Sequence, residues 1–215
     1  KSSRKAGGFY KETYYMRKLW LALLTLSMLF SMAGCGREQA APVAGVTVEK
    51  DGTITSVLMD SFEKEFYDLE DLRDMIQLEA ATHNQEKGGE RIRLESLEMN
   101  GSNCVAVMKY QSFEDYAEYN EVPFFSGTVE EAEDAGINLS VTWLQAGGNA
   151  SMQWKEIEAA QDYRLVVWYA DMPTAVPGKI RYYSDNLTLA DAKKAKPAQS
   201  DTAEGESGPF YVIYK

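Results

Sequence analysis

Residues 16–35 constrain this chain more than any other part of its sequence. Arg17 and Lys18 form a short basic segment, and an almost unbroken apolar run follows at residues 19–30 before small residues lead to Cys35. A membrane-spanning helix needs about 20 apolar residues, and this run is shorter. The layout is that of an export signal, which is removed and does not join the folded domain. A short, uncleaved membrane anchor is the alternative interpretation.

The end of this stretch resembles the lipobox of bacterial lipoprotein signal peptides. Ala33, Gly34 and Cys35 match the motif, and Met32 stands where the family prefers Leu. The resemblance implies that a signal peptidase recognises Met32, Ala33 and Gly34 and cuts before Cys35, which carries a diacylglyceryl group. Two acyl chains would hold the protein stably at a membrane, where one chain would be marginal.

The residues before and after Cys35 differ in charge. The signal peptide is expected to cover residues 1–34. Its first 15 residues are basic and polar without an apolar period, and represent either a gene-start artefact or an extension of the basic segment. Residues 1–34 hold six of the 22 Lys and Arg residues and one of the 33 Asp and Glu residues, so residues 35–215 carry a formal charge of −16. That charge argues against nucleic-acid partners and disfavours direct adsorption to anionic lipid headgroups.

The rest of the chain predicts a tether followed by one domain. Residues 35–45 have small side chains and no periodicity, which is typical of a flexible tether, here lipidated at Cys35. For residues 46–215 we expect a single α+β domain, with a mainly antiparallel sheet built from hairpins, one longer helix and two short helices.

Three hairpins are predicted from turn residues that recur at steps of 49 and 48 residues. Their strands are residues 46–50 with 53–59, residues 91–99 with 103–110, and residues 137–144 with 151–155. The apolar residues change parity between Leu94 and Leu97, which predicts a bulge. The regular spacing also suggests a repeated hairpin-plus-helix unit, although the side chains of the three units differ.

Capping residues predict the helices. Asp68 is an N-cap for the longer helix, which Gly88 ends. Its predicted buried stripe consists of Leu69, Leu72, Ile76 and Ala80, widened by Met75 and Leu78. Ser112 with Asp115, and Thr128 with Glu131, predict the starts of the two short helices.

The last quarter of the chain predicts three strands and a loop. The apolar run at residues 163–170 suits a central strand, and residues 179–183 and 210–214 are further strands. Residues 191–208 are polar, with Lys193-Lys194, Pro197 and then a run of mostly polar and small residues, which favours a mobile surface loop.

Few residues offer chemistry. Cys104 lies in an apolar run that favours a buried, unpaired thiol, and a Cys35–Cys104 disulfide in an unlipidated protein is the alternative. His83 is the single histidine and falls near a helix C-terminus, which favours it electrostatically. The acidic cluster at residues 130–134 matches no calcium loop, and we expect no metal, cofactor or catalytic residue.

Aromatic residues are the most suggestive candidates for binding. Trp143, Trp154, Tyr182 and Tyr183 lie in the predicted strands. They form either part of the core, because aromatic rings bury large areas, or a partly exposed aromatic surface for a glycan, a peptide or an envelope protein.

A second resemblance covers most of the chain after Cys35. The lipobox, the Asp51-Gly52 hairpin, the helix that begins after Asp68, and the motifs at residues 176–184 and 211–215 are similar to those of small lipoproteins of clostridial gut Firmicutes. That family has no assigned activity. The resemblance implies a protein anchored in the cell membrane that faces the outside of the cell, and assigns no functional residue besides Cys35.

Two classes of function remain open from the sequence. The anchor, the aromatic residues and the missing catalytic motifs favour a binding or interaction domain without enzymatic activity. The alternative is a small cell-envelope hydrolase that uses Asp or Glu side chains, because 32 acidic residues allow many carboxylate pairs.

The lipobox interpretation predicts the effect of Cys35→Ala. The variant should accumulate as an uncleaved precursor without lipid, because the thiol that carries the diacylglyceryl group is gone. Mass spectrometry of the N-terminal fragment measures both cleavage and lipid. Ser31→Ala, outside the motif, is the matched control, and normal processing of Cys35→Ala would contradict the interpretation.

Overall fold

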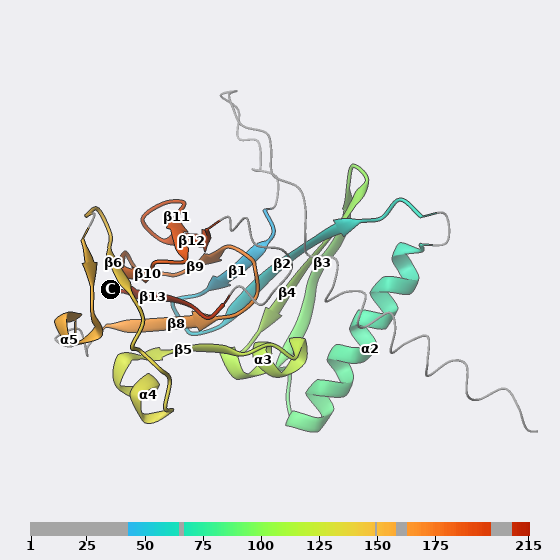
Figure 1. Cartoon of the computed structure of the whole chain (residues 1–215). Coiled ribbons are helices and arrows are strands. Elements are labelled where there is room, and N and C mark those ends of the chain that lie inside the picture. The colour runs from blue at the N-terminus through green and yellow to red at the C-terminus, as the bar shows by residue number, and fades with distance from the viewer. Residues whose placement is uncertain (1–42, 65–66, 149, 158–162, 199–207) are drawn as a thin grey trace, which may run out of the picture. The chain divides into compact units, whose positions relative to one another are not determined.

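The computed structural model describes residues 43–64, 67–148, 150–157, 163–198 and 208–215 (Figure 1). The predicted α+β class is confirmed: these residues form two mostly antiparallel sheets and four helices. Residues 1–34, Cys35 and most of the predicted tether lie outside the described residues. The described ranges all belong to one compact unit, Pro42–Lys215.

The first sheet, sheet A, has seven strands. In order across the sheet they are β11 (Leu187–Leu189), β12 (Lys194–Pro197), β9 (Thr174–Ala175), β1 (Gly45–Val48), β2 (Ile54–Ser61), β4 (Asn103–Tyr110) and β3 (Ile92–Asn100). The pairing of β1 with β9 is parallel and the others are antiparallel. The chain therefore contributes early and late segments to the same sheet.

Two of the predicted hairpins form one half of sheet A. The hairpin of β1 and β2 turns at Asp51-Gly52, and that of β3 and β4 turns at Asn100-Gly101. Gly52 has φ 89° and Gly101 has φ 64°, a left-handed backbone that glycine adopts readily. The predicted bulge is confirmed, because the register of β3 against β4 shifts between Leu94 and Ser96.

One face of this half-sheet is the buried face, which we call the inner face. Ile54, Tyr110 and Ile92 occupy one row across β2, β4 and β3, and each is at most 1% exposed. The ring of Tyr116, on helix α3 (Phe113–Asn120), packs edge-on against Tyr110 at 5.1 Å. Helix α3 therefore covers the inner face at this end of the strands.

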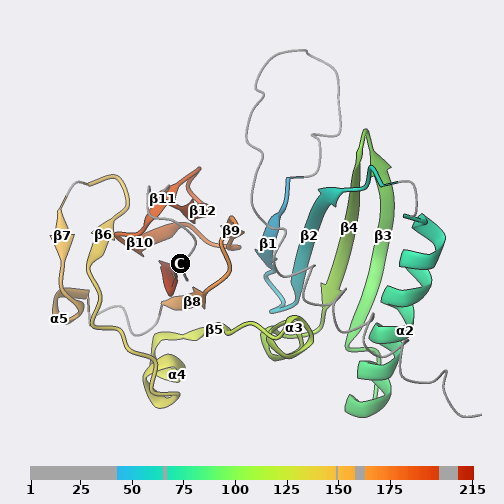
Figure 2. The same cartoon turned by 45° about the vertical axis from the view of Figure 1, so that its right-hand side comes forward.

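Helix α2 (Leu69–Lys87) lies along β3 (Figure 2). As predicted, the Asp68 side chain accepts hydrogen bonds at its N-terminus and Gly88 ends it with φ 73°. Its buried residues include Leu72, Ile76 and Ala80. The prediction for Leu78 was wrong, since this side chain is 69% exposed. Two residues after Ile76, it points to the opposite side of the helix.

Side chains of α2 also form hydrogen bonds with backbone groups of β3, the edge strand of sheet A. The Asn84 Nδ2 donates to Ile92 O at 2.8 Å, and its Oδ1 accepts from the backbone N–H groups of Arg91 and Ile92 at 2.8 Å. Farther along β3, Arg73 Nη2 donates to Leu97 O at 2.9 Å. Unpaired backbone groups on an edge strand invite association with other chains, and these two helical side chains bond to those of Ile92 and Leu97.

The second sheet, sheet B, has six strands. In order across the sheet they are β5 (Phe124–Thr128), β8 (Arg164–Trp168), β13 (Phe210–Tyr214), β10 (Ile180–Ser184), β6 (Trp143–Gln145) and β7 (Ser151–Met152). The predicted strand β8 is central, as its apolar run favoured. Strand β5, at the edge, was not predicted.

Helix α4 (Val129–Asp134) and helix α5 (Trp154–Ile157) contribute to the core on one face of sheet B. This core includes Val129, Ala132, Leu165 and Ile213, each completely buried. The predicted capping box of α4 is confirmed by reciprocal hydrogen bonds between Thr128 and Glu131.

The third predicted hairpin is smaller than expected. Strands β6 and β7 have three and two residues, and α5 begins where the second strand was predicted to continue. Helices α2, α3 and α5 each follow a hairpin, as a repeat requires, but the third hairpin belongs to sheet B. The three units therefore do not form a regular array.

The last part of the chain, residues 174–215, crosses between the sheets. Strand β9 belongs to sheet A, β10 to sheet B, β11 and β12 to sheet A, and β13 to sheet B (Figure 1). The predicted loop at residues 191–208 was wrong in part, because β12 pairs with both β11 and β9. Its short Lys-Ala-Lys-Pro sequence carries no strand pattern, and its pairing with β11, just before it in the chain, and with β9 gives it strand conformation. Residues 199–207 lie outside the described residues.

The contacts of Asn84 predict a stability change. Asn84→Ala leaves the N–H and C=O groups of Ile92 without these partners, and should lower the free energy of unfolding by about 2 kcal/mol. Chemical denaturation measures the difference. Gln85→Ala, at an exposed neighbouring position, should stay within about 0.5 kcal/mol of the parent. Equal losses in both variants would contradict the edge-capping role of Asn84.

Candidate functional site

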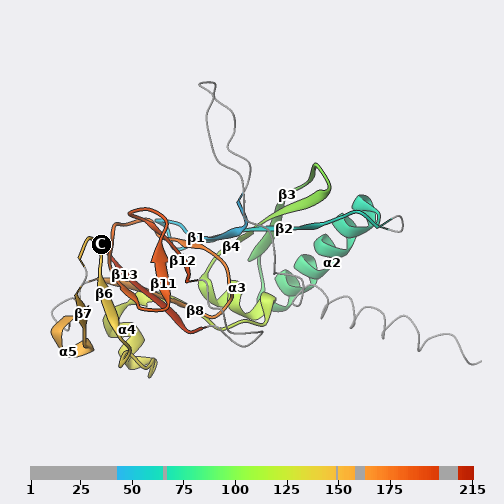
Figure 3. The ribbon, with the colours of Figure 1, turned by 45° about the horizontal axis from the view of Figure 1, so that its top comes forward.

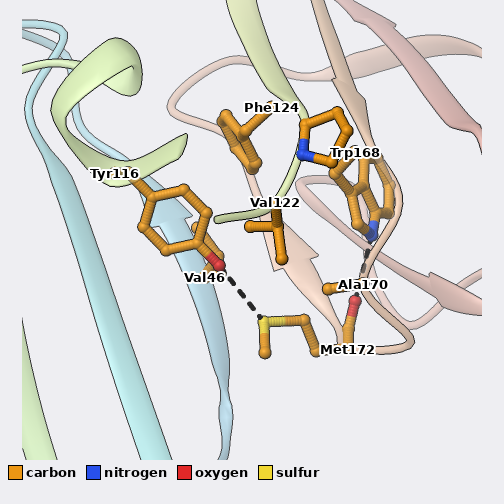
Figure 4. A pocket seen from close by; sticks show the side chains of 8 residues that line it. Val46, Tyr116, Val122, Phe124, Trp168, Ala170 and Met172 are labelled. Atoms are coloured by element: carbon orange, nitrogen blue, oxygen red, sulfur yellow. Dashed lines mark hydrogen bonds between the residues drawn. The ribbon is translucent and has the colours of Figure 1, made fainter. Parts of the chain in front are cut away.

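A small hollow lies where sheet A, sheet B and α3 meet (Figure 4). Its lining is formed by Val46, Tyr116, Val122, Pro123, Phe124, Trp168, Ala170 and Met172. The Tyr116 hydroxyl lies 3.8 Å from Met172 Sδ, and Trp168 Nε1 donates to Met172 O at 3.2 Å. The hollow has no interior space that would hold a water molecule. It is a packing junction, and burial raises the pKa of the Tyr116 phenol.

The predicted aromatic surface requires a correction at Trp143. This side chain is completely buried, and its Nε1 donates to Leu139 O at 3.1 Å. Its ring packs against Tyr211 at 5.7 Å. Trp143 is therefore a core residue with a satisfied indole N–H, and takes no part in an exposed surface.

The other three predicted aromatic residues are half-buried and do not share one surface. Trp154, on α5, lies with its ring centroid 5.9 Å from that of Trp143. Tyr182 packs against the same core of sheet B. Tyr183 is the next residue on β10, so its side chain points to the other face of the sheet. The four residues thus do not assemble into a platform.

A buried polar cluster joins α2, α3 and the start of β3. Asp115, 3% exposed, accepts hydrogen bonds from Arg91 Nε at 3.2 Å and from Ser112 Oγ at 2.9 Å. His83 Nε2 lies 3.7 Å from Asp115 Oδ1 and makes no hydrogen bond. The hydrogen bonds join the first turn of α3 to Arg91, and His83 of α2 packs beside the carboxylate.

The geometry of this cluster does not match a nucleophile with its base. The Ser112 hydroxyl donates to the carboxylate and not to the imidazole, whereas an activated serine donates to a base that a third group orients. The Arg91 guanidinium neutralises the charge of the Asp115 carboxylate. We interpret the Asp115 cluster as a structural connection between helices.

Cys104 is buried on β4 and unpaired. Burial raises the pKa of its thiol, and the nearby Asp60 carboxylate acts in the same direction. A raised pKa leaves little thiolate, the reactive form, at neutral pH. The alternative disulfide with Cys35 stays a prediction, because Cys35 lies outside the described residues.

The acidic cluster at residues 130–134 makes up most of the short helix α4. Glu131 caps the helix by accepting a hydrogen bond from Thr128 N at 2.6 Å. Hydrogen bonds from Thr128 lower the pKa of this carboxyl below its usual value of 4.5. Within the described ranges, no group of three or more His, Cys, Asp or Glu side chains is placed to hold a metal ion.

The face of sheet A opposite the inner face is the candidate binding surface, and we call it the outer face. Its half-buried residues include Thr47, Thr55, Val57, Val107 and Lys109, which alternate with buried residues of the inner face. Thr47, Thr55 and Lys109 form one row across β1, β2 and β4, and Val57 and Val107 form the next. All five side chains are half-buried.

The shape and chemistry of the outer face favour contact with another surface. Alternation places the side chains of Val57 and Val107 opposite those of Ser56 and Met108, which are buried on the inner face. The outer face combines methyl groups, hydroxyl groups and cationic groups, because Arg93 of β3 lies beside Lys109 in the same row. The alternation is visible in the sequence, but the predicted binding surface consisted of aromatic residues and did not include these strand positions.

The chain matches no known family model, no curated protein and no solved structure. Among the described residues, no helix combines the length and apolar character that crossing a membrane requires. The candidate site therefore depends on the geometry of this chain alone.

The capping role of Glu131 predicts an acid-sensitive contribution to stability. Because its pKa is lowered on folding, the contribution is complete above about pH 4.5, the unfolded value, and disappears as the pH falls through the folded pKa. Glu131→Gln should therefore flatten the fall in stability on acidification.

Denaturant midpoints between neutral and acidic pH measure this effect. Glu133→Gln, which removes an acidic group of the same helix outside the capping box, is the matched control. An identical pH profile for the parent and Glu131→Gln would contradict the prediction.

Proposed function

We propose that this chain is an extracytoplasmic lipoprotein, held on the outer side of the cell membrane by a lipid on Cys35. The basic segment, the short apolar run and the sequence Ala33-Gly34-Cys35 support this anchoring. In this proposal residues 35–44 connect the lipid to β1, the first strand of the domain. The domain then works within a short distance of the membrane.

The domain acts as a binding module whose contact surface is the outer face of sheet A. The observation that carries this proposal is the double row of Thr47, Thr55 and Lys109 beside Val57 and Val107. Small-molecule sites are concave and enclose their ligands, whereas a face of alternate strand residues is broad and shallow. Its partner is therefore a protein of the cell envelope, whose surface combines apolar groups with hydrogen-bonding groups that complement those of the outer face.

Site-specific photo-crosslinking in cells tests the binding surface. A photoreactive amino acid replaces Val57 on the outer face, and in a matched strain it replaces Gln77, an exposed residue of α2. Irradiation should give a discrete adduct with an envelope protein from position 57 and none from position 77.

A second substitution links the adduct to the surface. Val107→Glu, next to Val57, should reduce the adduct several-fold because it places a charge in the contact. Gln77→Glu adds the same charge elsewhere and should leave the adduct unchanged. Equal adducts from positions 57 and 77, or an adduct that Val107→Glu does not affect, would contradict the proposal.

A further inference from the structure

Basic side chains gather where β10 and β12 approach each other. Five of them form what we call the basic patch: Lys179, Arg181, Lys193, Lys194 and Lys196. Lys179, Arg181 and Lys193 are exposed, and the other two are half-buried. The patch lies on strands of both sheets, at the opposite edge of sheet A from α2 (Figures 1 and 3).

Backbone contacts hold the two parts of the patch together. Ile180 N donates to Ala192 O at 2.8 Å, which joins the start of β10 to the residue before Lys193. Val176 N donates to Lys193 O at 2.8 Å, and Lys193 Nζ donates to Pro177 O at 2.8 Å. These contacts hold Lys179, at the start of β10, close to Lys193, just before β12, and Arg181, Lys194 and Lys196 follow on the same two strands.

The local charge is opposite to that of the domain. Residues 179–198 contain these five basic residues and two acidic residues, Asp185 and Asp191, a formal charge of +3, while residues 35–215 carry −16. No ion pair between described residues involves a side chain of the basic patch. Exposed charges interact mainly within a Debye length of about 8 Å in physiological salt, so a nearby surface senses the patch more than the distant carboxylates.

We infer that the basic patch docks on the anionic phospholipid headgroups of the membrane that carries the lipid anchor. This inference rests on the proposed anchoring at Cys35. The ten residues 35–44, which precede Gly45, span at most roughly 35 Å. Strand β12 is two strands from β1, which is roughly 10 Å across the sheet. The tether therefore keeps the patch within reach of the membrane.

The tether also explains why a modest patch suffices. Attachment at one point makes the second contact intramolecular, with a high effective concentration. Each Lys or Arg near an anionic membrane contributes roughly a fivefold gain in affinity. The three exposed residues together would shift the docked population by roughly 100-fold, and salt would reverse it. The net negative charge of the domain thus does not prevent local adsorption, contrary to the expectation from composition.

Lysine labelling on vesicles tests the docking. The complete chain is expressed in bacteria, purified from the membrane fraction, and reconstituted in vesicles of phosphatidylcholine, either alone or mixed with phosphatidylglycerol in equal parts. A membrane-impermeant amine reagent then modifies exposed lysines, and mass spectrometry quantifies each position. Lys179 and Lys193 should lose reactivity several-fold on the anionic vesicles at low salt and regain it at high salt.

Internal and variant controls make the result specific. Lys155, exposed on α5, should react equally on both kinds of vesicle. Reversing three patch charges by Arg181→Glu, Lys194→Glu and Lys196→Glu should abolish the lipid-dependent protection of Lys179 and Lys193. A matched triple variant, Lys50→Glu, Lys87→Glu and Lys155→Glu, should retain it.

The outcomes separate the two proposals. A chain that does not float with the vesicles contradicts the anchoring at Cys35, and the docking inference falls with it. A chain that floats but shows equal lysine reactivity on both vesicles contradicts docking alone. Protection that rises with protein density on neutral vesicles would assign the patch to a second copy and overturn the inference.

Discussion

The parallel pairing of β1 with β9 is the constraint on which the rest of sheet A depends. Val46 N donates to Pro173 O at 2.9 Å, and a Cβ atom on Gly45 would lie 2.6 Å from that same oxygen. Only glycine permits this close approach of two backbones. The pairing joins the first two hairpins to β12 and β11, so that strands more than 120 positions apart form one sheet. It also brings Val46 to the junction with Trp168 of sheet B.

Polar side chains add hydrogen bonds to the hydrophobic packing of α2 and α3. Helix α2 packs through an apolar stripe, but Asn84 fixes its position against β3 through three hydrogen bonds. Asp115, in the first turn of α3, accepts hydrogen bonds from Arg91, which precedes β3, and from Ser112, the N-cap of α3. Satisfied hydrogen bonds of this kind favour one arrangement of α2 and α3 against β3.

Local signals in the sequence predicted the elements that local interactions determine. The Asp51-Gly52 turn, the Asp68 cap and the Thr128 capping box all appear where expected. The sequence did not predict β5, whose partner β8 lies about 40 residues away along the chain, nor the short strands β9, β11 and β12, which carry too few residues for a strand pattern. The burial of Trp143 was also not predictable, because the period and composition of the sequence do not distinguish a ring in the core from one on a surface. The candidate outer face could be found only after the register was known.

The position of β1 determines how the domain responds to force. Strand β1 is the first strand of the domain and lies between β2 and β9, away from both edges of sheet A. A pull on the chain ahead of Gly45, along the strand, would load the hydrogen bonds to both neighbours at once in shear. These hydrogen bonds would have to break together, whereas the bonds of a strand peeled from a sheet edge break one by one. The domain is therefore built to resist mechanical unfolding from its N-terminal side.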